Sequence, residues 1–215
     1  MNHSATTPSN TDWKQLDARI RQVDEERWLS SRYAKQPERR ALLALYGLNY
    51  ELARVRVSVT EPGLGAIRFQ WWRDAIDLVE GGENARHDVA LALQTPVDEG
   101  LLHIEALHKL IDGHEIAFER DDRAAEPEAH LAAIAARIFT SAHGWGQEIA
   151  ELAPHWAALR RGERVGFGPV VGPAPADIRP AIAHYRLRRI MGKEGRPSRI
   201  AQRICVLRGI LSGAV

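Results

Sequence analysis

Apolar side chains recur along residues 41–59 at intervals of four and three, and this stripe constrains the fold more than any other feature of the chain. Such spacing keeps the apolar residues on one side of an α-helix, so it predicts a long helix with one buried face. The residues that form the stripe are Ala41, Leu45, Leu48, Leu52, Val55 and Val59.

A second amphipathic helix is expected to follow almost at once. The segment Thr60-Glu61-Pro62 predicts a stop and a new start, because proline is tolerated in the first turn of a helix but not in its interior. Gly81-Gly82 is typical of a helix end. The apolar positions between these two signals are Leu64, Ile67, Trp71, Ala75 and Leu78.

The rest of the chain contains further helical patterns and no convincing strand. Thr11 or Asp12 could N-cap a helix that begins near Trp13, and Pro37 suits the first turn of the next helix. The fold class is therefore all-α, a bundle of about seven to nine helices by pattern. Further helices are expected near residues 101–118, 128–140, 145–161, 177–190 and 200–211, and loops over 83–96 and 162–175.

Three regions are expected along the chain. Residues 1–11 predict a disordered lead, residues 12–190 a helical domain, and residues 191–215 a basic, divergent tail. From Gly166 onward there are nine Arg or Lys residues against two acidic ones. A basic end can favour RNA, anionic lipid or an acidic partner, although a solvated tail is the simpler interpretation.

The overall totals bound the compartment and the partners. The net formal charge is +1, which gives no general attraction to nucleic acid, so we expect no nucleic-acid partner. Cys205 is the single cysteine, which fits a reducing compartment. No apolar run approaches the length of a membrane span, and the first residues lack the features of a secretory signal. A cytoplasmic protein is the expectation.

The stretch ALLALYGLNYELARVRVSVTEPGLGAIRFQWWRDAIDLVEGG, residues 41–82, resembles the squalene/phytoene synthase family. The features that carry the resemblance are the ALYGLN segment, the EPGLGAIR break and the IRFQWWRDAI helix, in that order. The similarity is good from about Asp17 to Gly82, weaker to about Arg164, and slight beyond Gly166. The resemblance implies an all-α, isoprenoid-synthase-like helical bundle. The active members of the family join two allylic diphosphates head to head.

Active members of that family need magnesium, because ionisation leaves a highly charged diphosphate beside a carbocation. Aspartates four residues apart on one helix hold the metal ions, and a facing helix repeats the device. Carried onto this sequence, the first pair falls at Ala53 and Val57, with Arg54 between them. No Asp occurs from Glu25 to Arg73.

The second motif would fall within residues 145–161, where Glu148 and Glu151 are the carboxylates and no Asp occurs. We therefore expect no cofactor and no metal site. Mg²⁺ held by Glu148 and Glu151 belongs to an alternative, in which the chain is a prenyltransferase of head-to-head isoprenoid biosynthesis with an altered metal site. If the chain is active, it is a transferase that acts on isoprenyl diphosphates.

One branch of the family resembles this pattern more closely. It includes a mitochondrial assembly factor of respiratory complex I, with bacterial relatives, and its members share an N-x-E-L-A-x-V style of segment. Here that segment runs from Asn49 to Val55. The resemblance implies a non-catalytic binding or assembly factor with a respiratory-chain component as its protein partner, at the inner face of a bacterial membrane.

A carrier of a prenyl diphosphate or another lipid is a further alternative. Guanidinium groups can hold a diphosphate by paired hydrogen bonds, and aromatic rings can line an apolar site. The residues expected to bind such a ligand are Tyr46, Asn49, Arg54, Arg68, Trp72 and Arg73.

Simpler roles for these residues remain open. Arg54 could pair at the surface with Glu51 or Ser58, and Arg68 could pack along the neighbouring indole rings. Trp71 and Trp72 are adjacent on a helix and cannot face the same way, so one of them is expected in the core. The last residues, from MGKEGRP onward, are unlike the closing helices of the family, and truncation or a frameshift would explain the difference.

Overall fold

The computed structural model describes residues 10–83, 86–122, 127–139, 144–166, 168–191 and 197–215. In these ranges there are ten α-helices, one 3₁₀ segment and no strand, so the all-α prediction is confirmed. Most of the predicted lead, residues 1–11, lies outside the described residues, as does most of the MGKEGRP segment.

The helices follow one another with short connections. They are α1 (Asn10–Val23), α2 (Glu25–Ser31), α3 (Gln36–Ser58), α4 (Pro62–Glu80), α5 (Asp88–Asp98), α6 (Ile104–Glu119), α7 (Glu128–Arg137), α8 (Gly146–Arg160), α9 (Arg179–Ile182), the 3₁₀ segment η1 (Ala183–Arg189) and α10 (Arg199–Ser212).

The two helices predicted most strongly form as expected. Pro37 and Pro62 lie in the first turns of α3 and α4, where a missing backbone N–H costs nothing. Gly81 is the C-cap of α4, and Gly82 follows it with a φ of +70°, a conformation that glycine adopts without strain. The prolines and glycines of the sequence therefore predict the ends of these helices closely.

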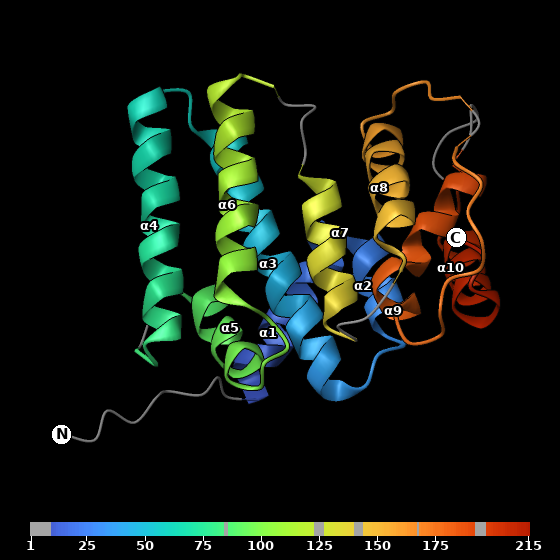
Figure 1. Ribbon diagram of the computed structural model, residues 1–215, viewed down its shortest axis with the longest axis horizontal. Helices are drawn as coiled ribbons and strands as arrows, with labels where there is room; N and C mark the ends of the chain where they lie inside the picture. The colour runs from blue at the N-terminus through green and yellow to red at the C-terminus, as the bar shows by residue number, and fades with distance from the viewer. Residues whose placement is uncertain (1–9, 84–85, 123–126, 140–143, 167, 192–196) are drawn as a thin grey trace.

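Helix α3 is the centre of the bundle. Its residues 41–48 are all buried, and it packs against α1, α5 and α6. Figure 1 shows α4, α6, α7 and α8 side by side with α3 behind them, and α4 and α10 at opposite ends of the molecule. The core is therefore continuous along the row of helices, while α4 has neighbours on one side only.

Three local predictions are corrected. Residues 88–98 form α5, although a loop was predicted over residues 83–96, because Val89, Ala90 and Leu93 are buried where α5 packs against α3. Thr11 and Asp12 lie inside α1 rather than in front of it. Residues 179–189 form a short helix and a 3₁₀ segment instead of one helix.

Candidate functional site

A central cavity of about 150 Å³ opens beside α3, where α6, α7 and α8 face it. Five of its lining residues come from α3, on successive turns of the helix, so this face of α3 forms one complete wall. The lining residues are Val23, Asp24, Asn49, Tyr50, Ala53, Arg56, Val57, His114, Pro127, Glu128 and Arg160.

Ala53 and Val57, where the family resemblance leads us to expect the first aspartate pair, both line this cavity. They lie four residues apart and so share one helix face. The two positions predicted from the sequence therefore lie on the cavity wall. Their side chains there are a methyl group (Ala53) and an isopropyl group (Val57). Arg54, which lies between them in sequence, does not line the central cavity.

A buried ion cluster lies beside the cavity. The guanidinium of Arg27 on α2 donates to the carboxylates of Asp24 and Glu128, and its side chain is 2% exposed. Tyr185 donates from its hydroxyl to Glu128 Oε1 at 3.1 Å, and Arg160 Nη1 lies 3.7 Å from Asp24 Oδ2. Both carboxylates of the cavity are therefore already engaged by cations.

The electrostatics of the cluster favour its charged form. Burial raises the pKa of Asp24, but the charges of Arg27 and Arg160 outweigh it and bring the pKa below its usual value. Burial likewise lowers the pKa of Arg27, yet Asp24 and Glu128 hold it well above the ordinary value. Arg56 also lines the cavity, and it donates from Nη2 to the Asp122 carbonyl at 2.9 Å.

His114 contributes a neutral ring to the same cavity. Burial, together with the charge of Arg56, lowers the pKa of His114 to about 3. Its Nε2 lies 3.1 Å from Asn49 Oδ1, so with the amide oxygen as acceptor the proton resides on Nε2. The ring nitrogen Nδ1 is buried and has no hydrogen-bond partner among the described residues.

A second hollow, the outer groove, lies between α3 and α4 on the other flank of α3. It measures about 400 Å³ and combines two arginines with apolar and aromatic walls. Its lining residues are Glu51, Arg54, Val55, Ser58, Val59, Ile67, Arg68, Trp71, Trp72 and His87. The exposed fraction of Trp72 is 4% and that of Trp71 is 43%, which confirms that one indole belongs to the core.

The two arginines of the outer groove differ in their partners. Arg54 Nη1 lies 3.1 Å from Glu51 Oε2, and the Ser58 hydroxyl donates to the Arg54 carbonyl at 2.7 Å, so the predicted surface pairing is confirmed. Arg68 makes no hydrogen bond or ion pair with any described residue. One cation of the groove is therefore available to an anion without breaking an existing contact.

The six residues predicted to bind a ligand do not form one site. Asn49 lines the central cavity, whereas Arg54, Arg68 and Trp72 line the outer groove. Arg73 turns toward α6, where it donates to Asp112 at 2.6 Å and also to Glu115.

Tyr46 lies deeper still, beneath Arg27, whose guanidinium carbon is 5.8 Å from the centre of its ring. Burial raises the pKa of Tyr46 beyond its ordinary range, although the charge of Arg27 acts in the opposite direction. Tyr46 therefore belongs to the floor of the ion cluster rather than to the lining of either hollow.

The residues around the central cavity do not fit a magnesium cluster. Mg²⁺ prefers carboxylates that are free to coordinate it, but Asp24 and Glu128 are bound to Arg27. Glu148 and Glu151 on α8 line neither hollow, and Glu151 accepts from Gln147 at 3.4 Å. Among the described residues, no three His, Cys, Asp or Glu side chains group as metal ligands would.

Sequence reasoning missed the charged residues that shape the cavity. Arg27, Glu128 and His114 carry no motif, but His114 continues the apolar stripe of α6 through Leu107 and Ile111. A polar residue in an apolar register signals a buried partner. Glu128 likewise precedes Leu131 by one turn of α7. The position of these polar residues in the apolar pattern of α6 and α7 was the signal in the sequence that could have identified them.

Comparison with known proteins places this bundle in a family. Residues 20–136 match squalene/phytoene synthase, more than half of the chain, and the chain therefore belongs to this family of all-α isoprenoid-synthase folds. The match spans α3 and α4 and reaches the end of α7. No solved structure matches the chain.

Curated relatives refine the comparison. The chain is 31% identical over 96 residues to the "NADH dehydrogenase (ubiquinone) complex I, assembly factor 6" of Bos taurus, and 30% identical over 96 residues to that of Homo sapiens. In both cases the matched region is 45% of this chain and 29% of the relative, so less than a third of each relative is covered. In the described residues, no helix combines the length and the hydropathy needed to span a bilayer.

Proposed function

We propose that the protein is a non-catalytic member of its family that binds a component of the respiratory chain and assists the assembly of complex I. The observation that supports the proposal is that Ala53 and Val57, the positions to which the family resemblance assigns the first aspartate pair, line the wall of the central cavity. The names of the relatives, which are complex I assembly factors, supply the class of partner.

The charge of the cavity supports the same proposal. The magnesium ions that stabilise a departing diphosphate must themselves be held by free carboxylates. Here Arg27 consumes the carboxylates, and α3 offers no others to the cavity. A cavity of about 150 Å³ is also small for two prenyl chains, since ligand pockets usually measure about 300–1,000 Å³.

The test has a catalytic and a binding arm. Incubation with farnesyl or geranylgeranyl diphosphate and Mg²⁺ should release no diphosphate above a protein-free control. Purification of the tagged full chain from the native membrane fraction should recover subunits of NADH dehydrogenase, identified by mass spectrometry. Protein-dependent release of diphosphate that Glu148→Ala abolishes would establish the transferase alternative. Recovery of no respiratory subunit would remove the assembly role.

A second candidate, a carrier of a prenyl diphosphate or another anionic lipid, is favoured by the outer groove. The groove is large enough for a drug-sized ligand and brings Arg54 and Arg68 to the rim of an apolar wall formed by Ile67 and Trp71. The guanidinium groups would take the anion, and the indole the chain.

Thermal shift with a non-hydrolysable prenyl thiodiphosphate, without Mg²⁺, tests the carrier. A bound ligand stabilises the folded protein by mass action, by about 2.7 kcal/mol of unfolding free energy at a hundredfold excess over Kd. The melting temperature should therefore rise. Arg68→Gln should abolish the shift. The matched control is Arg73→Gln on the same helix, because the Arg73 guanidinium is held on α6. No shift in the unaltered protein would exclude the carrier.

A further inference from the structure

Helix α10 exposes an apolar stripe that no described residue covers. The stripe repeats at intervals of four and three, like a buried helix face, yet it lies on the surface. We call it the outer face of α10; its members and their exposed fractions are Ile200 (71%), Ile204 (48%), Leu207 (39%) and Leu211 (71%).

The opposite side of α10 is fixed to the bundle, so the outer face cannot turn inward. A Cβ added at Gly209 would lie 3.0 Å from the Ala183 carbonyl oxygen, which shows how closely α10 approaches η1. Arg179 donates from Nη1 to the carbonyls of Ile210 and Leu211, at 2.9 Å each. These contacts hold the last turn of the helix against α9 and set the direction of the stripe.

Positive charge borders the stripe on both sides. At 100° per residue, Arg203 and Arg208 fall on opposite flanks of the line from Ile200 to Leu211. Neither makes an ion pair with a described residue, whereas Arg199 Nε lies 4.0 Å from Glu25 Oε2. No Asp or Glu occurs within α10. The helix therefore combines an apolar stripe with two unpaired cations of the same sign.

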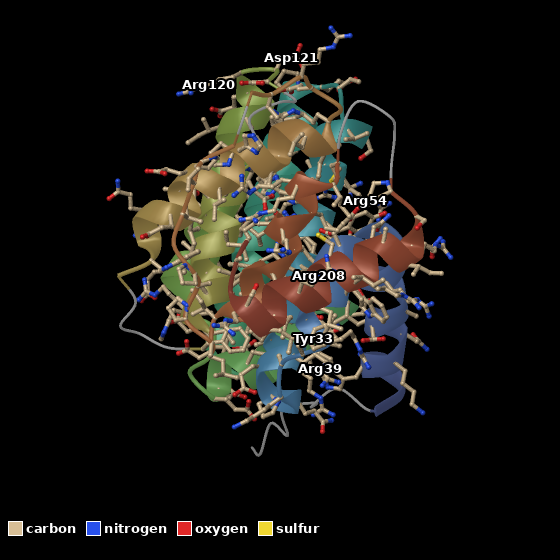
Figure 2. All side chains as sticks on the ribbon, turned by 90° about the vertical axis from the view of Figure 1, so that its right-hand side faces the viewer. Tyr33, Arg39, Arg54, Arg120, Asp121 and Arg208 are labelled. Atoms are coloured by element: carbon tan, nitrogen blue, oxygen red, sulfur yellow. The ribbon has the colours of Figure 1, made fainter. Side chains whose placement is uncertain are left out.

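The face is accessible as a whole. In Figure 2, α10 lies across the end of the bundle that faces the viewer, with Arg208 labelled on it. Figure 1 shows that this end is opposite to α4, and hence far from the outer groove. A broad partner could therefore contact the outer face without meeting either hollow.

We infer that the outer face of α10 docks the protein on an anionic lipid bilayer. The helix lies parallel to the membrane, with Ile200, Ile204, Leu207 and Leu211 in the boundary between head groups and acyl chains. The guanidinium groups of Arg203 and Arg208 reach lipid phosphates on either side. This surface is separate from the proposed function, which concerns the cavity and a protein partner.

The charge pattern favours a bilayer over a second copy of the chain. A two-fold partner would place Arg203 and Arg208 near the same residues of its mate, and like charges at an interface oppose association. A bilayer offers phosphates on both sides of an inserted stripe, and the surface potential of anionic lipids attracts each arginine.

Vesicle flotation of the full chain tests the inference. The protein should float with vesicles of phosphatidylcholine mixed with phosphatidylglycerol, much less with phosphatidylcholine alone, and less as salt is added. Arg203→Gln and Arg208→Gln should each lower the partition coefficient roughly fivefold, the equivalent of about 1 kcal/mol per arginine. Ile204→Asp combined with Leu207→Asp should lower it at least roughly tenfold.

Two matched controls lie away from the outer face, one on α6 and one at its C-cap. Ile116, 45% exposed, is as accessible as Ile204, and Arg120 is an exposed arginine. Ile116→Asp and Arg120→Gln should leave flotation unchanged, and circular dichroism should show that all variants fold. Absent flotation, equal binding to neutral vesicles, or binding that the α10 variants do not alter would each overturn the inference. A dimer in sedimentation that Ile204→Asp dissolves would overturn it in favour of a second copy.

Discussion

Arg27 and Glu128 lie 101 positions apart in the sequence and form an ion pair in the interior, where their side chains are 2% and 3% exposed. The pair joins α2 to α7, and Glu128 also lines the central cavity. Because each charge would be costly to bury alone, the two residues depend on each other more than on any local structure.

Removing one member of this pair should destabilise the fold strongly. Glu128→Leu leaves the Arg27 guanidinium buried with only Asp24 as its counter-charge, and we expect a loss of about 3–5 kcal/mol of unfolding free energy. Arg27→Met combined with Glu128→Leu should lose less than Glu128→Leu alone, because the stranded charge is gone. Urea denaturation of the two single variants and the double variant measures the coupling. Simple additivity would contradict it.

Acidification should destabilise the protein through His114. Its pKa in the folded protein is about 3, far below the ordinary value of 6.5, so the unfolded chain binds a proton that the folded chain excludes. Stability is therefore fully present above pH 6.5 and falls as the pH drops toward 3. Burial also lowers the pKa of His184 well below its ordinary value, and it acts in the same direction.

The contribution of His114 can be isolated by substitution. Between pH 7.5 and pH 5 one such histidine costs about 2 kcal/mol, and His114→Gln should remove that part of the loss. Urea melts at several pH values measure it. The control His103→Gln changes an exposed ring, and its pH dependence should match that of the unaltered protein. An unchanged slope in His114→Gln would show that the ring is not the source.

Two glycines of the EPGLGAIR segment should respond differently to alanine. A Cβ on Gly65 would overlap the ring of Phe118, which packs edge-on against Phe69 at 5.8 Å. Gly65→Ala should therefore cost about 1–3 kcal/mol through overpacking. Gly63 has no atom near its Cβ position, so Gly63→Ala should be neutral or stabilising by up to about 1 kcal/mol. Thermal denaturation of both variants tests the contrast, and equal effects would contradict it.

Metal removal should have no effect on stability under the proposed function. A protein that holds no Mg²⁺ gains nothing from it by mass action, so EDTA and added MgCl₂ should both leave the melting temperature unchanged within about 1 °C. Differential scanning fluorimetry measures this directly. A rise with MgCl₂ that EDTA reverses would point to metal ligands that the central cavity does not supply on α3.

Local signals in the sequence predicted the elements that are fixed locally. Proline and glycine set the bounds of α3 and α4, and the apolar period set the buried face of α3. Helix α5 was predicted as a loop. Pro96 lies inside it and leaves the Ala92 carbonyl without its backbone N–H donor, but packing on α3 compensates. Tertiary contact outweighed local propensity in that segment.

The site was less accessible to sequence reasoning than the fold. The face of α3 on which Ala53 and Val57 lie follows from helical periodicity, and both residues line the cavity as the register predicts. The partner of each arginine does not follow in this way. Arg73 lies five residues after Arg68. Arg73 is held by α6 and Arg68 is not, because the partner of each arginine depends on which helices pack together.

The buried ion pair between Arg27 and Glu128 also limits how early in synthesis the native fold can form. During synthesis, the guanidinium leaves the ribosome long before its acceptor on α7 exists, and it must stay hydrated until then. Closure of so long a loop is slow, since the chain must order many intervening residues first. The first two helices therefore reach their final places only after more than half of the polypeptide has emerged.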